Sequence, residues 1–292
     1  MSRFPLRRLA ALCVATLIVS LVQTERLQGN PYPNFVASIC WSLGRGIDEA
    51  KALWGLNIMK EEDIGRLRLY DSAPTPPNLL ELAKKSGVRV TMGAWLGNNR
   101  EENTDQLLML RKAISAGLTE PTAVIGSEVL SFSNVTLDEF IGYIEETKRN
   151  LPENVAVTTA ELYEVLVQNP RLIEVQRGIV GVHYYPFAHA IPIEHALDDL
   201  VDHYNQLKML SGDKRVVIYE TGWPSEGTPI GKAVPSVENQ KKYIRDVTNW
   251  AQAKGVEVYL FQIIDEPFKA LIENHDFEAH WGLRRSDGSP KQ

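Results

Sequence analysis

Cysteine is almost absent from this 292-residue sequence, which contains only Cys13 and Cys40. Cys13 lies in an apolar N-terminal stretch and Cys40 in a predicted strand, and neither belongs to a C-x-x-C motif. A disulfide framework, a thiol-redox motif and a cysteine-based metal site are therefore excluded. We interpret Cys40 as a buried small residue, and we expect stability to come from a hydrophobic core, which a chain of this length can bury.

An excess of positive charge is also lacking, because the formal net charge is −6 at pH 7. This balance argues against a protein that binds nucleic acid or anionic membranes mainly by electrostatics, and it suits a neutral partner. The six histidines show no metal-ligand spacing. We therefore predict neither a metal site nor a cofactor, and we interpret His183 and His280 as hydrogen-bonding or packing residues. No G-x-S-x-G motif surrounds Ser127, which excludes a serine nucleophile of that type.

The N-terminal apolar run, residues 9–22, is short for a membrane span at 14 residues. Arg3, Arg7 and Arg8 precede it, and no acidic residue occurs before Glu25. A charged start followed by an apolar core is typical of a secretory signal, although an A-x-A cleavage pattern is missing.

We predict that residues 1–24 form a signal peptide or an N-terminal anchor, with an organelle transit peptide as a further interpretation. Residues 25–292 then form one domain. The expected location is secreted, periplasmic or associated with the cell wall, with membrane contact only if the N-terminal segment is retained.

Short apolar, β-branched runs recur along the remaining chain and predict strands. They span residues 35–43, 64–71, 88–96, 122–130, 154–162, 179–187, 216–224 and 256–267. The runs are near-continuous rather than alternating, which is typical of parallel strands buried on both faces. Helical patterns lie between them, at residues 77–87, 104–117, 136–151 and 236–255.

The spacing of these elements predicts the fold class. The strands start about 32 residues apart, which is the size of one strand–helix unit. Eight such units in one domain predict an α/β fold, a (β/α)8 TIM barrel. A doubly wound open sheet is the competing interpretation, but no G-x-G-x-x-G motif follows the first strand. Thr136 with Glu139 has the layout of a helix capping box, and Ser236 with Asn239 repeats it more weakly.

Polar and aromatic residues occur where the predicted strands end. They are Tyr70, Asp71, Trp95, Asn98, Glu128, Tyr184, Tyr185, Glu220, Trp223, Asp265 and Glu266. The active site of a barrel of this kind lies at the carboxyl ends of its strands, so we expect these residues on one rim. A single glutamate after a strand is more often a loop residue or a helix cap. The prediction of a site therefore depends on the convergence of many such positions.

Glu128 and Glu220, at the ends of the fourth and seventh strands, suit glycoside hydrolysis. One carboxyl group protonates the departing oxygen, and the other attacks the anomeric carbon or activates a water that does so. Trp95, Tyr185 and Trp223 offer flat apolar faces on which sugar rings can stack. The pattern favours a carbohydrate-active enzyme.

Four segments carry a more specific likeness: RLRLYD, IGSEVL, YETGWPS and DEPFK…EAHWGL. They resemble the signatures of glycoside hydrolase family 17, the β-1,3-glucanase family, and occur in the expected order. The likeness covers roughly residues 35–290, and YETGWPS is its most specific part. It implies a (β/α)8 barrel with a retaining double-displacement mechanism.

By this resemblance, Glu128 is the acid/base and Glu220 is the nucleophile. The predicted substrate-binding residues are Tyr70, Trp95, Ser127, Tyr185, Trp223, Glu266, Lys269 and Glu278. Of these, Trp223 is expected to be a sugar-facing platform beside the nucleophile, and the last three to form a polar cluster beside the acid/base.

The sequence departs from the family pattern at three places. Ser127 occupies a position where many members have an asparagine that can bond the sugar 2-hydroxyl. His183 stands where many plant members have asparagine. The segment 51–71, between the first two strands, is several residues shorter than usual in the family, which normally fits a fuller helix there.

The predicted function is hydrolysis of β-1,3-linked glucan, a neutral polysaccharide or oligosaccharide. A β-1,3-glucanosyltransferase on the same scaffold remains open, because the sequence does not say whether water or another sugar chain accepts the glycosyl group. A non-catalytic β-glucan-binding barrel and a membrane-anchored scaffold that keeps only the fold are the alternatives from other classes.

Overall fold

Eight short parallel strands form the centre of the protein. The computed structural model describes residues 37–42, 47–73 and 76–291, so the predicted signal or anchor segment lies outside the described residues. The strands are β1 (Ala37–Cys40), β2 (Ile64–Leu69), β3 (Arg89–Ala94), β4 (Thr122–Ser127), β5 (Ala156–Leu162), β6 (Ile179–His183), β7 (Arg215–Thr221) and β8 (Val258–Leu260). Each forms within its predicted run, except that β7 begins one residue earlier.

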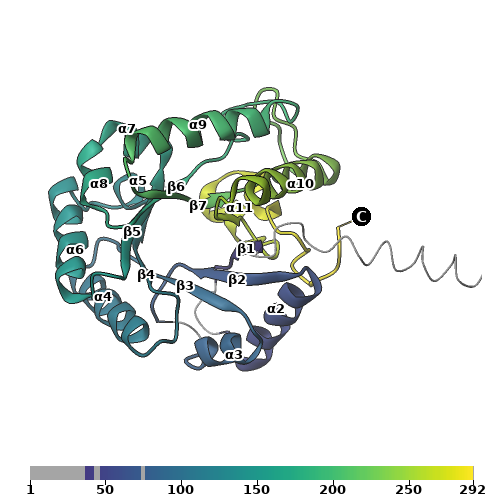
Figure 1. Ribbon diagram of the computed structural model, residues 1–292. Helices are drawn as coiled ribbons and strands as arrows, with labels where there is room; N and C mark the ends of the chain where they lie inside the picture. The colour runs from purple at the N-terminus through teal and green to yellow at the C-terminus, as the bar shows by residue number, and fades with distance from the viewer. Residues whose placement is uncertain (1–36, 43–46, 74–75, 292) are drawn as a thin grey trace, which may run out of the picture. The chain divides into compact units, whose positions relative to one another are not determined.

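The strands pair in sequence order and close into a barrel. Every pairing is parallel, and β1 meets β8 through the register Ser38 with Tyr259. This closure excludes the open-sheet alternative and confirms the predicted (β/α)8 TIM barrel. Figure 1 shows the helices arranged as a ring outside the strands.

The helices are α2 (Glu49–Glu61), α3 (Leu79–Lys85), α4 (Arg100–Ser115), α5 (Val129–Phe132), α6 (Leu137–Asn150), α7 (Tyr163–Gln168), α8 (Pro170–Val175), α9 (Ala196–Leu210), α10 (Val237–Lys254) and α11 (Lys269–Glu273), with a 3-10 helix η1 (Asp276–His280). None of the described helices is both long and apolar enough to cross a membrane.

Local capping explains where several helices begin. The side chains of Thr136 and Ser236 accept backbone N–H bonds at the starts of α6 and α10, as predicted. The predicted start of α4 at residue 104 was wrong, because Asn99 caps the helix earlier by accepting from two backbone N–H groups. The short segment after β1 still forms the 13-residue helix α2, which Asp48 caps.

The barrel interior has an apolar layer and, at the amino-terminal ends of the strands, a charged layer. Cys40 is fully buried in the apolar layer, as predicted. Burial raises the pKa of its thiol to about 12, which keeps it protonated and unreactive. In the charged layer, Arg66 pairs with Glu120 at 2.9 Å and with Glu257 at 3.4 Å. The opposite rim, at the carboxyl ends, carries the candidate site.

Candidate active site

Glu128 follows β4 directly and turns the chain sharply. Its backbone has the left-handed values φ 52° and ψ 37°, which cost about 1–2 kcal/mol for a residue with a Cβ atom. Three hydrogen bonds hold this conformation: the Glu128 N–H donates to Ala160 O at 2.8 Å, and its carbonyl accepts from Ser131 and Phe132 at 3.1 Å each. The side chain is therefore free to reach across the rim.

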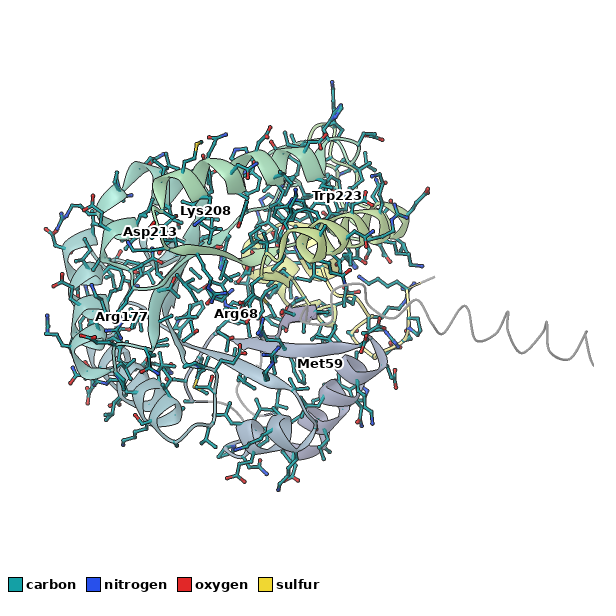
Figure 2. The ribbon with its side chains drawn as sticks, in the orientation of Figure 1. Met59, Arg68, Arg177, Lys208, Asp213 and Trp223 are labelled. Atoms are coloured by element: carbon teal, nitrogen blue, oxygen red, sulfur yellow. The ribbon has the colours of Figure 1, made fainter. Side chains whose placement is uncertain are left out.

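Glu220 lies within β7 and is buried. Arg68 on β2 donates from Nη1 to Glu220 Oε1 at 2.7 Å. The Tyr185 hydroxyl, just after β6, donates to Glu220 Oε2 at 2.5 Å. Each carboxylate oxygen thus has its own donor, which fixes the carboxylate plane. Figure 2 labels Arg68 inside the ring of strands.

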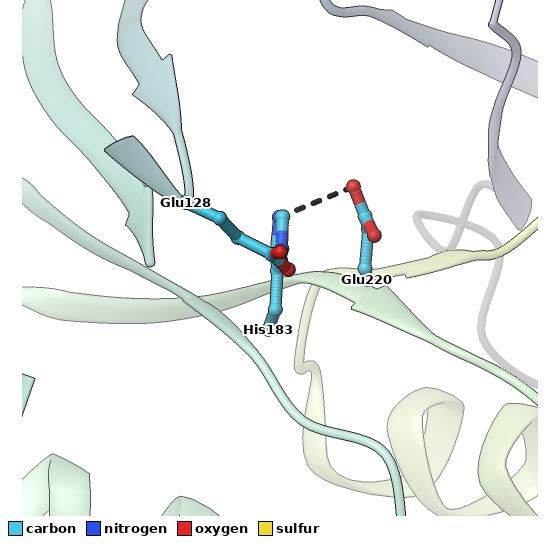
Figure 3. Close-up of side chains that lie close together, drawn as sticks. All are labelled: Glu128, His183 and Glu220. Carbon is cyan, nitrogen blue, oxygen red and sulfur yellow. Dashed lines mark hydrogen bonds and ion pairs between the residues drawn. The ribbon is translucent and has the colours of Figure 1, made fainter. Parts of the chain in front are cut away.

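His183, the last residue of β6, lies between the two glutamates (Figure 3). Its Nδ1 is 2.6 Å from Glu128 Oε1, and its Nε2 is 3.3 Å from Glu220 Oε1. Arg68 can only donate, and its Nη1 lies 2.9 Å from Nε2, so a neutral imidazole accepts there and carries its proton on Nδ1. Nδ1–H therefore donates to Glu128 in both protonation states of the ring. The interpretation of His183 as a hydrogen-bonding residue agrees with this geometry.

The charges around Glu220 favour its ionised form. Burial alone would raise the pKa of Glu220, but the charges of His183 and Arg68 hold it below its usual value. The hydroxyls of Tyr185 and Tyr70 lower this pKa further, although Tyr70 makes no regular hydrogen bond. Glu220 is therefore an anion in neutral and mildly acidic solution.

Glu128, His183 and Glu220 are residue types that can ligate metal ions. Among the described residues, donor atoms of Glu128, His183 and Glu220 lie within 4.8 Å of one another. The Arg68 guanidinium, however, lies within 2.9 Å of both His183 Nε2 and Glu220 Oε1. Because a permanent cation already faces two of the three donors, these residues do not fit a divalent metal ion, and we assign none.

The predicted polar cluster assembles after β8. Lys269 Nζ is 3.4 Å from Glu266 Oε2, and Glu278 accepts from Trp281 Nε1 at 2.8 Å. Burial, followed by the charges of nearby carboxylates that include Glu128, raises the pKa of Glu278 to about 7. The cluster is therefore within electrostatic reach of Glu128.

The barrel sequence matches known proteins over most of its length. A family model described as the BtgE/BtgC glycoside hydrolase domain matches residues 48–282. A probable family 17 glucosidase of Saccharomyces cerevisiae, SCW4, is 24% identical over 225 residues, which cover 76% of this chain and 57% of that protein. The chain belongs to glycoside hydrolase family 17. A glucan 1,3-beta-glucosidase of Arthroderma benhamiae is 28% identical over 228 residues, which cover 73% of each chain.

Solved structures agree with the assignment to family 17. The glycoside hydrolase family 17 β-1,3-glucanosyltransferase of Rhizomucor miehei superposes with a TM-score of 0.77 at 25% identity, covering 88% of this chain and 95% of that one. An endo-laminarinase from Formosa shares the fold, with a TM-score of 0.74 at 16% identity over 87% of this chain and 84% of that one.

Trp223 does not lie where the sequence analysis of this family 17 chain expected it. The side chain is completely buried, its Nε1 donates to Val234 O at 3.0 Å, and its ring packs against Phe187 and Tyr243. Figure 2 places it beside α10, away from Arg68. Trp223 therefore offers no exposed face to a sugar, and the expectation of a platform is corrected to a packing role beneath the rim.

The other predicted residues of the family 17 site lie at the rim. Tyr70 lies under the Arg68 guanidinium, 4.5 Å from ring centre to Cζ, and Ser127 Oγ accepts from Arg68 Nη2 at 3.2 Å. Trp95 is 51% exposed after β3, so its ring is available to solvent. Tyr185 combines the bond to Glu220 with an edge contact to Trp281.

Arg68 is the site residue that the sequence analysis missed. Its side chain is almost entirely buried, and it contacts Glu220, His183 and Ser127. A signal was available in the RLRLYD motif of this family 17 chain. Side chains two apart on a strand share a face, so Arg68 had to point the same way as Tyr70, and a buried arginine requires an acidic partner.

Proposed function

We propose that this protein is a retaining glycoside hydrolase that acts on β-1,3-linked glucan, with Glu220 as nucleophile and Glu128 as acid/base. The observation that carries the proposal is the short gap between the carboxylates, because one oxygen of Glu128 lies within 4.8 Å of one oxygen of Glu220. Retaining enzymes hold their carboxyl groups about 5–5.5 Å apart, whereas inverting enzymes need about 6.5–9.5 Å to admit a water between them.

The environments of the two glutamates support different roles. Arg68 and Tyr185 keep Glu220 ionised and oriented, as attack on an anomeric carbon requires. Glu128 stands at the rim with its Oε1 held by His183, which leaves Oε2 to carry the proton that moves to the departing glycosidic oxygen. In the second half of the reaction Glu128 takes a proton from the acceptor, and the acceptor oxygen displaces Glu220 from the anomeric carbon.

The substrate is inferred from the named relatives and from the rim. The relative from Arthroderma benhamiae is a glucan 1,3-beta-glucosidase and the neighbour from Rhizomucor miehei is a β-1,3-glucanosyltransferase. The exposed ring of Trp95 and the carboxyl groups of the polar cluster offer stacking and hydrogen bonding to a neutral sugar chain. A Candida albicans relative, 24% identical, is a cell surface mannoprotein, which supports a location at the cell wall.

Mass spectrometry of products from reducing-end-labelled laminarihexaose tests the proposal. We expect the wild type to shorten the hexaose and Glu220→Gln to leave it intact. Glu120→Gln is the matched control, because Glu120 is a carboxylate at the opposite end of the barrel, and it should retain turnover. Turnover by a folded Glu220→Gln variant would refute the nucleophile assignment.

The same experiment separates hydrolysis from transfer. The likeness to a glucanosyltransferase over 95% of its chain favours transfer as the second candidate. Products longer than the starting hexaose would assign a glucanosyltransferase, while shorter products alone would assign a hydrolase. Binding of the hexaose without any product would leave only the glucan-binding barrel.

A further inference from the structure

Glu161 on β5 is a buried carboxyl group that the proposed mechanism does not use. The residue has no exposed surface, and its Oε1 accepts a hydrogen bond from the Leu130 backbone N–H at 3.2 Å. Its Oε2 has no hydrogen-bond partner among the described residues. Burial raises the pKa of Glu161 to about 7, so keeping an ionisable group here has a cost that calls for a compensating role.

The position of Glu161 ties it to the acid/base. β5 pairs with β4, and the N–H of Glu128 donates to the carbonyl of Ala160, the residue just before Glu161. The charge of Glu128 is among the causes that raise the pKa of Glu161. Two successive residues of β5 therefore interact with Glu128: Ala160 through a backbone hydrogen bond and Glu161 through its charge.

The start of α5 lacks its own cap. Glu128 is the N-cap residue, and an N-cap side chain normally accepts from the second or third backbone N–H of its helix. Glu128 makes no such bond, and its Oε1 instead faces His183 Nδ1 at 2.6 Å. Leu130 is the second residue of α5, so its N–H is one that the cap would have satisfied, and Glu161 accepts it instead.

We propose that Glu161 is a positioning residue for the acid/base, and that it caps α5 from β5 so that the Glu128 side chain is released for proton transfer. The inference rests on the proposed function of Glu128. It accounts for a buried acid with one satisfied oxygen, and for a glutamate held in a left-handed conformation that a residue with a Cβ atom otherwise avoids.

Loss of the acceptor leaves the Leu130 N–H unsatisfied close to the buried Val129. An unsatisfied backbone donor is unfavourable, and the turn can relieve that cost by relaxing toward a conformation in which the Glu128 carboxylate caps its own helix. The acid would then no longer face the departing oxygen. Proton donation should suffer while nucleophilic attack by Glu220 does not.

Leaving-group dependence separates these two outcomes. Cleavage of laminari-oligosaccharides needs a proton on the departing oxygen, whereas a 2,4-dinitrophenyl laminaribioside releases a stable phenolate without one. We expect Glu161→Met, which keeps the length of the side chain but lacks an oxygen, to lower kcat/KM on laminari-oligosaccharides by about 10- to 100-fold. The same variant should stay within about 3-fold of wild type on the dinitrophenyl substrate. Glu161→Gln keeps an acceptor oxygen and should stay close to wild type on both.

The controls make each result decisive. Glu161→Asp shortens the reach by one methylene and should show a smaller loss confined to the oligosaccharides, which keeps the test available if the methionine variant does not fold. Equal losses on both substrates, or no loss on either, would overturn the positioning role. Glu128→Gln must itself show the leaving-group dependence; if it does not, the proposed acid/base is wrong irrespective of Glu161. Glu120→Gln, at the opposite end of the barrel, should affect neither substrate selectively.

Discussion

Replacing Arg68 by methionine should move the acidic limb of the pH–rate profile to higher pH. The guanidinium is buried and lies 2.7 Å from the carboxylate of Glu220. The pKa of Glu220 is held below its usual value because this charge helps to offset the cost of burial. Without Arg68 the carboxylate keeps its proton to higher pH, and a protonated carboxyl group cannot attack the anomeric carbon.

The size of the effect follows from the geometry. Two unit charges about 4 Å apart attract by about 4 kcal/mol at an effective dielectric constant near 20. Arg68→Met removes this attraction, while His183 and Tyr185 still face Glu220 and compensate in part, so we expect the limb to move to higher pH.

The assay is kcat/KM against pH on a dinitrophenyl laminaribioside, because this substrate removes the dependence on Glu128, the proposed acid. Arg66→Met is the matched control: Arg66 lies two residues earlier on the same strand and pairs with Glu120 at 2.9 Å, at the other end of the barrel. The acidic limb of the Arg66→Met profile should stay in place even if this variant is less stable than wild type. An unmoved limb in Arg68→Met, or the same shift in both variants, would refute the assignment of Arg68 as the residue that favours ionised Glu220, the proposed nucleophile.

Three further predictions concern stability measured by urea unfolding. The folded-state pKa of Glu161, about 7, lies above the ordinary 4.5, so ionisation destabilises the fold as pH rises through this window. Relative to wild type, Glu161→Gln should therefore have a free energy of unfolding that is about 3 kcal/mol higher at pH 8 than at pH 4. The same difference from wild type at both pH values would contradict the raised pKa. Lys291→Met leaves the buried Asp265 without its partner at 2.7 Å and should lower the free energy of unfolding by about 3 kcal/mol or more. Adding Asp265→Asn to Lys291→Met should restore most of this loss. Gly126→Ala, at φ 72° with the new Cβ 2.2 Å from a neighbouring side chain, should cost more than about 2 kcal/mol. Gly117→Ala, at φ 66° in open space, should show only the strain of about 1 kcal/mol.

The barrel could be predicted because its signals are local and periodic. Near-continuous apolar runs show that a strand is covered on both faces, and their regular spacing leaves room for one helix each. The capping role of Thr136 was equally readable, because a cap acts within three residues of itself. Predictions from such local signals do not depend on which strands pair with one another.

Trp223 shows where this reasoning fails. Side chains on a strand alternate between its faces, so a residue three positions after an inward-facing Glu220 tends to point outward. Thr221 already does so, since its hydroxyl bonds Tyr243 on α10 at 2.5 Å, and Trp223 packs against the same tyrosine. The odd spacing of three residues from Glu220 indicates that Trp223 faces outward, as observed, whereas its proximity to Glu220 in sequence suggested that it faces the site.

Glu161 shows a different limit. Its role depends on the pairing of β5 with β4 and on the left-handed turn at Glu128, and neither is visible in a run of residues such as VAVTTAEL. A single glutamate at the end of an apolar run is compatible with a cap, a loop or a catalyst. Only the contact with the Leu130 N–H distinguishes them.

The departures from the family pattern at Ser127 and His183 belong to one arrangement, because the same guanidinium contacts both. Arg68 donates from Nη2 to Ser127 Oγ at 3.2 Å, and its Nη1 lies 2.9 Å from His183 Nε2. A hydroxyl oxygen and a neutral imidazole nitrogen can each accept a hydrogen bond from the guanidinium. Together with Glu220, these two residues give partners to both Nη atoms of Arg68. The charges of His183 and of Arg68 on β2 together favour the ionised form of Glu220, the proposed nucleophile.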